Sequence, residues 1–137
     1  MEVTASADDV DMLGHVSNIR YVGWVQQVAT SHSSALGLDL AAYRELGGVF
    51  IVRRHEIDYL GPAFAGDRLR LQTWVESWKA VSSVRMTSIS RLADASGQVL
   101  DEPVELARGK TLWVFASLPG GRPRRIPASV KSVFADL

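Results

Sequence analysis

The segment from Asp9 to Trp24, DVDMLGHVSNIRYVGW, concentrates residue types that can carry out chemistry. Two carboxylates, a glycine, a histidine and an asparagine fall within its first ten residues, and a tyrosine and a tryptophan follow. A carboxylate can act as a nucleophile or a general base, and an imidazole can transfer a proton near neutral pH. A helix that begins directly after such a segment also offers N–H groups to a developing negative charge.

A long helix is predicted directly after these residues, from Asn18 to Leu36. Ser17 is a suitable N-cap, and Gly37 stands where a C′ glycine ends a helix. Four positions, Val22, Val25, Ala29 and His32, are spaced three or four residues apart and therefore form a stripe along one face of this helix. His32 on this stripe is interpreted as a core or pocket-wall residue. The helix therefore buries one face along its length.

After this helix, the sequence predicts a short second helix at 38–46 and then a change to the two-residue alternation of β-strands. Strands are expected at 48–60, 68–78, 82–92 and 104–118, and a C-terminal helix at 127–137. With a short N-terminal strand, these segments predict an antiparallel meander. The expected fold is α+β, a curved antiparallel five-stranded sheet wrapped around one long central helix. Such a sheet leaves an edge or face for a partner, so a homodimer or a dimer of dimers is expected.

Composition excludes several classes of function. The chain has 137 residues, 47% of them hydrophobic, which fits a single globular domain over 1–137. Fifteen basic and fifteen acidic residues give a net charge of +0, which argues against nucleic-acid and anionic-membrane binding. No cysteine, signal peptide or membrane-length apolar run is present, so a cytoplasmic location is expected. Three histidines without a metal-binding spacing predict no metal site.

The opening segment also contains a recognisable pattern, D-x-D-x-x-G-H-V-x-N-x-x-Y, formed by Asp9, Asp11, Gly14, His15, Val16, Asn18 and Tyr21. This pattern resembles the signature of hotdog-fold thioesterases, in particular the 4-hydroxybenzoyl-CoA thioesterase-like group and the plant acyl-ACP thioesterases. The resemblance continues in RRHEIDYLGPAFAGDRLRLQTWVES and covers nearly the whole chain. It implies a hotdog-fold enzyme that hydrolyses the thioester bond between an acyl group and CoA or acyl carrier protein. It implies no cofactor.

The resemblance gives Asp11 the role of the catalytic carboxylate. Asp11 either attacks the thioester carbonyl to form an anhydride or acts as the base for a water molecule, and both routes stay open. A turn-stabilising or N-capping aspartate is the structural alternative. Gly14 is expected to permit a tight turn and close approach of the substrate. The N–H groups of residues 17–19 would then stabilise the oxyanion.

Three further residues are candidates for catalysis. His15 matches a catalytic histidine of the plant enzymes, but Leu13 stands where those enzymes have an asparagine, so a ring packed beside the turn is equally open. Asn18 either hydrogen-bonds the Asp11 carboxylate or substrate, or caps the helix. Glu56 matches a functional glutamate of the plant enzymes, and a charge on a solvated strand face is its alternative.

The expected substrate-binding residues are Gly14, Val16, Ser17, Ile19, Tyr21 and Trp24, of which the last two suit either the core or an acyl pocket. Two other functions are compatible with the same fold. One is an enoyl-thioester hydratase, and the other is a non-catalytic acyl-CoA-binding module.

Overall fold

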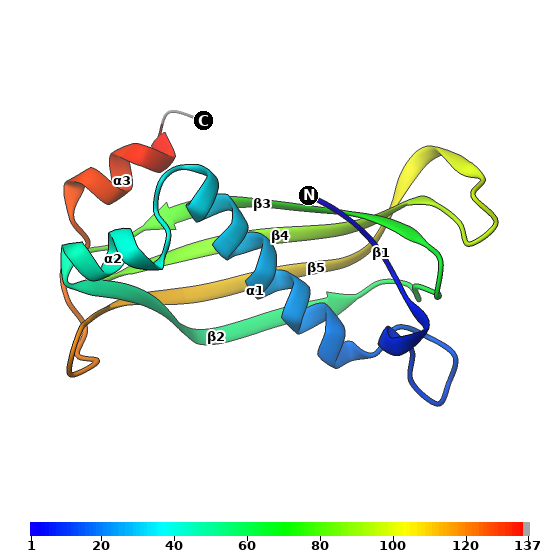
Figure 1. The fold of residues 1–137 in the computed structure, drawn as a ribbon, viewed down its shortest axis with the longest axis horizontal. Coiled ribbons are helices and arrows are strands. Elements are labelled where there is room, and N and C mark those ends of the chain that lie inside the picture. Colours follow the sequence, from blue (N-terminus) through cyan, green and yellow to red (C-terminus); the bar gives the residue numbers. More distant parts are fainter. Residues whose placement is uncertain (136–137) are drawn as a thin grey trace. The chain divides into compact units, whose positions relative to one another are not determined.

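The computed structural model describes residues 1–135, and its elements follow the predicted order (Figure 1). They are β1 (Glu2–Thr4), the 3-10 helix η1 (Ala7–Asp9), α1 (Asn18–Ala35), α2 (Leu40–Leu46), β2 (Gly48–Tyr59), β3 (Arg68–Trp78), β4 (Ser82–Ala93), β5 (Val99–Ser117) and α3 (Ala128–Ala135). The last two residues of the predicted C-terminal helix, 136–137, lie outside the described residues.

The last strand differs most from its predicted bounds. β5 begins at Val99 rather than Val104 and includes Pro103. Proline lacks an N–H, so it is tolerated in a strand only where that N–H is not needed for pairing. Pro103 is exposed, and the strand continues through it back to the hairpin that joins β4.

The strands form one five-stranded sheet in the order β1-β3-β4-β5-β2, and β1 pairs with β3 in antiparallel register. The predicted meander is therefore correct for β3, β4 and β5 and wrong for β2, which lies beside β5. Its connection to β3 explains the difference. The N–H of Leu60 donates to the carbonyl of Leu106 in β5 (2.8 Å), and the N–H of Ala5 donates to the carbonyl of Asp67 (2.9 Å). The 60–67 segment thus runs from β5 to the residue after β1 instead of closing a hairpin.

The chain forms two compact units. The first comprises 1–28, 57–73 and 87–109, and the second comprises 29–56, 74–86 and the chain from Lys110 onward. Helix α1 and strands β2 to β5 each contribute residues to both units.

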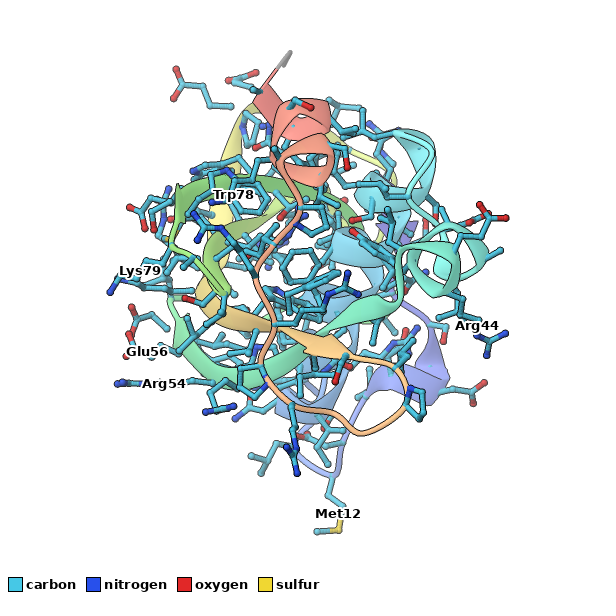
Figure 2. All side chains as sticks on the ribbon, turned by 90° about the vertical axis from the view of Figure 1, so that its left-hand side faces the viewer. Met12, Arg44, Arg54, Glu56, Trp78 and Lys79 are labelled. Atoms are coloured by element: carbon cyan, nitrogen blue, oxygen red, sulfur yellow. The ribbon has the colours of Figure 1, made fainter. Side chains whose placement is uncertain are left out.

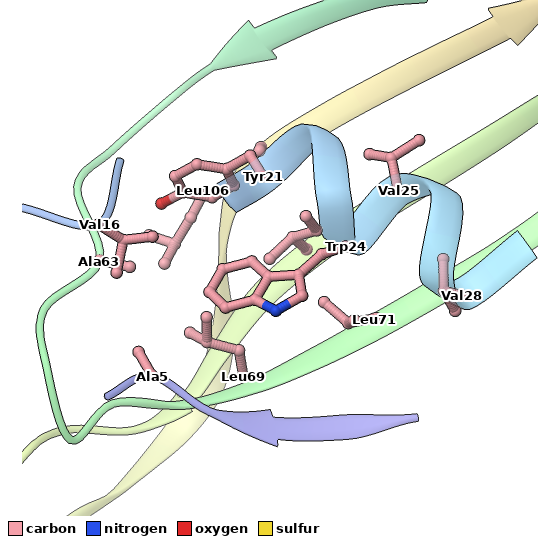
Figure 3. Close-up of a cluster of buried hydrophobic side chains, with 12 residues drawn as sticks. Ala5, Val16, Tyr21, Trp24, Val25, Val28, Ala63, Leu69, Leu71 and Leu106 are labelled. Atoms are coloured by element: carbon pink, nitrogen blue, oxygen red, sulfur yellow. The ribbon is translucent and has the colours of Figure 1, made fainter. Parts of the chain in front are cut away.

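The first unit has its core between the start of α1 and strands β3, β4 and β5 (Figure 3). Trp24 is only 1% exposed and packs in one cluster with Leu69, Leu71 and Leu106. The buried helix positions in this core are Tyr21, Trp24, Val25 and Val28. Of the predicted stripe, Val25 is buried here and Ala29 is buried in the second unit, whereas Val22 and His32 are only partly buried. Burial of each large side chain contributes about 1.5–3 kcal/mol. This packing fixes the first turns of α1 and the residues that precede them.

The second unit has a separate core, which includes Leu38, Tyr43, Phe115, Ile126, Val130 and Phe134. Asp39 begins α2 by accepting a hydrogen bond from the N–H of Ala42 (2.9 Å), and Gly47 ends it in a left-handed conformation with φ of +76°. In the described part of the chain, no helix has the length and apolar character that crossing a membrane requires.

Candidate active site

Asp11 begins a tight hairpin turn. Its N–H donates to the carbonyl of His15 (2.9 Å), and its carbonyl accepts from the N–H of Gly14 (3.1 Å). Its Oδ1 accepts from the N–H of Leu13 (2.8 Å), which is the Asx-turn geometry that favours aspartate at this position. Gly14 has φ of +81°, a conformation that L side chains rarely adopt. The turn-stabilising role of Asp11 and the turn role of Gly14 are therefore confirmed.

A second hairpin in the same unit, at 94–98, shows what such a turn does to an aspartate. The N–H of Asp94 donates to the carbonyl of Gln98 (2.9 Å), and the N–H of Gly97 donates to the carbonyl of Asp94 (2.9 Å). Here Oδ1 of Asp94 accepts from the hydroxyl of Ser96 (2.6 Å) and from the N–H groups of Ser96 and Gln98. The Ser96 hydroxyl bond is the largest cause that lowers the pKa of Asp94. The carboxylate of this hairpin is committed to the turn.

The Asp11 hairpin has the same backbone pattern but a different residue opposite the carboxylate. Leu13 stands where the other turn has Ser96, so no hydroxyl is available to the Asp11 carboxylate. Asp11 is exposed, and within residues 1–135 its Oδ2 has no hydrogen-bond or ion-pair partner. The turn therefore holds this carboxylate in place through one oxygen and leaves the other available to a ligand.

The start of α1 also leaves one donor available. Ser17 is the N-cap, because its Oγ accepts from the N–H of Ile19 (3.2 Å), and its own N–H donates to the carbonyl of Asp9 (2.8 Å). Capping thus belongs to Ser17 and not to Asn18. Of the N–H groups of residues 17–19, only that of Asn18 has no acceptor in the described part of the chain. The donors of the expected oxyanion hole are therefore reduced to the backbone N–H and the exposed side-chain amide of Asn18.

Asp9 connects the hairpin to the helix. Its Oδ2 accepts from the N–H of Ser6 (2.9 Å), and its Oδ1 pairs with Nε of Arg20 (3.0 Å). Both carboxylate oxygens are thus used locally, which is a structural role.

His15 lies on the other side of the hairpin and is exposed. Its ring packs edge-on against Phe64, with the ring centroids 5.3 Å apart. The next residue, Val16, is buried, and its N–H donates to the carbonyl of Ala63 (2.8 Å). The 62–67 loop therefore supports the chain between the hairpin and α1.

A buried ion pair holds that loop, and the sequence did not reveal it. Asp67 is 2% exposed, and its Oδ2 accepts from Nε of Arg91 (3.0 Å) and from the N–H of Phe64 (2.9 Å). Arg91 also donates to the carbonyl of Pro62. The two charged residues are 24 positions apart, so no local spacing indicates that they meet.

The remaining predicted contact residues divide by burial. Tyr21 and Trp24 are core residues whose rings pack edge-on with centroids 5.6 Å apart. Ile19, in contrast, is 82% exposed beside the candidate site. The hydroxyl of Tyr59 lies 3.5 Å from the carbonyl of Asn18.

Glu56 belongs to the second unit, whereas Asp11, His15 and Asn18 belong to the first. Its carboxylate pairs with Arg54, and both side chains are exposed (Figure 2). An exposed pair of this kind contributes little to stability. The geometry fits the alternative of a charge on a solvated strand face.

Within residues 1–135, no three side chains of histidine, cysteine, aspartate or glutamate gather closely enough to hold a metal ion.

Comparison with known proteins identifies the family. The model of the thioesterase-like superfamily matches residues 5–134. No curated protein matches the sequence significantly. Among solved structures, the chain is similar to a 1,4-dihydroxy-2-naphthoyl-CoA thioesterase from Synechocystis, at 22% identity and a TM-score of 0.83, with 100% of this chain and 95% of that chain covered.

Two other solved structures are similar. One is a DHNA-CoA thioesterase from Staphylococcus aureus, with 19% identity, a TM-score of 0.81 and coverage of 99% of this chain and 87% of that chain. The other is a gentisyl-coenzyme A thioesterase, with 19% identity, a TM-score of 0.79 and coverage of 98% of both chains. The family match and the shared fold give one conclusion: the chain belongs to the thioesterase-like superfamily and has the hotdog fold.

Proposed function

We propose that this chain hydrolyses an acyl thioester, with Asp11 as the reacting carboxylate and the start of α1 as the oxyanion hole. Two features of neighbouring residues carry the proposal. The exposed Asp11 carboxylate is held by only one oxygen, and the N–H of Asn18 at the following helix start has no acceptor in the described part of the chain. Membership in the thioesterase-like superfamily supports the same reaction class.

Two routes are compatible with this arrangement. In one, an oxygen of Asp11 attacks the thioester carbonyl, the thiolate leaves, and water hydrolyses the resulting anhydride. In the other, Asp11 takes a proton from a water molecule, whose oxygen attacks the carbonyl as the thiol leaves. The N–H of Asn18 stabilises the carbonyl oxygen in both routes. His15, which is exposed beside the hairpin, supplies a proton to the leaving thiolate.

The acyl group is proposed to be carried on the pantetheine arm of CoA or of an acyl carrier protein. The names of the similar structures describe naphthoyl-CoA and gentisyl-CoA thioesterases. An aromatic acyl-CoA is therefore the first class of substrate to test. Water is the second substrate, and the proposed reaction uses no metal or redox cofactor.

A second copy of the chain is the proposed partner, as a homodimer or a dimer of dimers. Large apolar side chains are exposed in the Asp11 hairpin, at the start of α1 and directly after β2, namely Met12, Leu13, Ile19 and Leu60. Exposed large apolar side chains that gather in a patch are typical of an interaction surface. Sedimentation of the wild type and of Ile19→Glu tests this, since a charge in the contact is expected to release monomers. An unchanged sedimentation coefficient would exclude Ile19 from the interface.

Hydrolysis of a panel of aromatic and aliphatic acyl-CoA thioesters, followed by release of free thiol, tests the proposed activity. Turnover of any member supports a thioesterase. Binding without turnover would favour the acyl-CoA-binding module. Loss of the enoyl-CoA absorbance without thiol release would favour the hydratase.

A further inference from the structure

The net charge of +0 is the sum of two units of opposite charge. The second unit contains ten of the fifteen basic residues and five of the fifteen acidic residues, so its formal charge is +5. The first unit contains the other five basic and ten acidic residues, so its formal charge is −5. A surface of one sign attracts partners of the opposite sign and speeds their association. An anionic partner is therefore expected for the second unit.

Half of the basic residues of the second unit lie in or near one connector, the segment 118–127 between β5 and α3. Three of them belong to the connector itself, one lies in α2, and one lies between β3 and β4. All five side chains are exposed. We call these five residues the basic strip: Arg44, Lys79, Arg122, Arg124 and Arg125. Figure 2 shows Arg44 and Lys79 on opposite sides of the view, so the strip extends across this end of the unit.

Backbone hydrogen bonds hold the connector against the elements that carry the other two cations. At its start, the N–H of Leu118 donates to the carbonyl of Gly47, which ends α2 (3.0 Å). Towards its end, the N–H of Ile126 donates to the carbonyl of Ala80, the residue after Lys79 (2.8 Å). The strip is therefore positioned by the fold before any partner binds, which lowers the entropic cost of binding.

The cations of the basic strip have no carboxylate partner within residues 1–135. The ion pairs found there involve other arginines, namely Arg20, Arg54, Arg68, Arg91 and Arg108. Arg124 donates to the carbonyl of Leu46 (2.7 Å), which is a neutral acceptor. Glu45 follows Arg44 in the sequence and is exposed, but it forms no ion pair with the strip. The strip therefore presents positive charge that an external anion can neutralise.

The chemistry of the strip favours an acidic protein surface over other anions. Four of its five cations are arginines, whose planar guanidinium groups can each bind a carboxylate through two hydrogen bonds. A nucleic acid or an anionic membrane extends far beyond one unit, so the −5 charge of the first unit opposes its binding. A coenzyme is usually held by groups that converge in a pocket, but none of the five residues lines the cavity of about 260 Å³ in this unit.

We propose that the basic strip docks a protein partner through an acidic surface of that partner. In the thioesterase reaction proposed above, this partner is an acyl carrier protein that delivers the acyl group, and this part of the inference rests on the proposed function. The docking itself uses only residues of the second unit and none of the Asp11 hairpin. It can therefore be measured without turnover.

The probe is an apo-acyl carrier protein, which lacks the pantetheine arm and cannot present a thioester. Its binding to the wild type is measured by calorimetric titration between about 50 and 300 mM NaCl. The affinity is expected to fall at least about tenfold over this range, because salt screens exposed charges. No binding at the lowest salt concentration, or an affinity that does not change with salt, would overturn the proposal.

A charge-reversal pair locates the docking surface. Arg122→Glu/Arg125→Glu reverses two charges of the strip, and Arg53→Glu/Lys110→Glu is the matched control. The control changes the net charge by the same amount at exposed positions of β2 and β5 in the same unit. The strip variant is expected to bind the carrier protein at least about tenfold more weakly than the control. Equal affinities of the two folded variants would refute the strip, because only the total charge would then matter.

Three other anions test the choice of partner: CoA, vesicles containing phosphatidylglycerol, and a single-stranded oligonucleotide. Each is expected to bind the wild type at least about tenfold more weakly than the carrier protein under the same salt conditions. Tighter binding of any of them, lost in Arg122→Glu/Arg125→Glu, would overturn the proposal in favour of that anion. This outcome needs no thioester hydrolysis.

Hydrolysis of an acyl-CoA separates the docking from the proposed reaction. Arg122→Glu/Arg125→Glu is expected to hydrolyse acyl-CoA at the wild-type rate, since the strip contains no residue of the candidate active site. A wild type that binds the carrier protein but hydrolyses no thioester would refute the reaction and support the docking. A wild type that hydrolyses acyl-CoA but does not bind the carrier protein would refute the docking alone.

Discussion

Replacing Asn18 with proline removes the one N–H that we propose as the oxyanion donor and is expected to leave α1 intact. Asn18 is the first residue of α1, and proline is favoured at that position because its fixed φ suits a helix start. Ser17 precedes it as the N-cap, a position that usually has extended backbone and so tolerates a following proline. Asn18→Ala is the matched control, because it removes the side-chain amide but keeps the N–H.

The expected magnitude follows from the hydrogen bonds at the helix start. The N–H groups of Ser17 and Ile19 already donate within the chain, so no neighbouring amide replaces that of Asn18. Loss of one oxyanion donor typically lowers kcat by about 10²–10³, or about 2.7–4 kcal/mol of transition-state stabilisation. Asn18→Pro is expected to show such a loss, and Asn18→Ala a smaller one.

The assay is release of free thiol from an acyl-CoA that the wild type hydrolyses, with thermal unfolding of each variant measured alongside. A slow Asn18→Pro variant with a wild-type melting temperature supports the proposed oxyanion hole. Equal rates for Asn18→Pro and Asn18→Ala would refute it, because the two differ in the backbone N–H.

Other predictions concern the supports of the site and the second unit. Leu13→Ser places a hydroxyl beside the Asp11 carboxylate and is expected to lower kcat several-fold relative to Leu13→Ala. The same kcat for Leu13→Ser and Leu13→Ala across their pH–rate profiles would count against this. Arg91→Met leaves the buried Asp67 carboxylate without its cation and is expected to reduce the free energy of unfolding by about 3 kcal/mol in urea denaturation, with partial recovery when Asp67→Asn is added. Burial holds the pKa of His32 below its ordinary 6.5, so the unfolded chain takes up the proton first and stability falls as the pH drops below that value. Urea unfolding of His32→Gln between about pH 7.5 and pH 5.5 should therefore show a weaker pH dependence than the wild type.

Local patterns in the sequence predicted most of the elements. The sequence predicts Ser17 as the N-cap of α1 because a capping side chain acts on the adjacent turn, and the structure confirms this prediction. The strand alternation gave β3 its bounds, Arg68–Trp78. The position of β2 was missed because strand pairing depends on contacts distant in the sequence, here the hydrogen bond from Leu60 to Leu106.

The candidate site was predictable to the same extent. The hairpin of Asp11 and Gly14 follows from local turn chemistry, and both residues belong to the family pattern in the sequence. The sequence could not reveal which amide at the helix start is free, because that depends on the carbonyl of Asp9 reaching Ser17. The pairing of Arg91 with Asp67 was equally hidden, since it brings the end of the 62–67 loop together with β4.

The most direct test of the proposed reaction is the rate of acyl-CoA hydrolysis by Asp11→Asn. Asparagine keeps a side-chain oxygen that can accept from the N–H of Leu13, so the turn and the fold are expected to survive. It lacks the negative charge that both proposed routes require. The proposal predicts a loss of kcat of several orders of magnitude with unchanged thermal unfolding. Hydrolysis at the wild-type rate by Asp11→Asn would contradict the assignment of Asp11 as the reacting carboxylate.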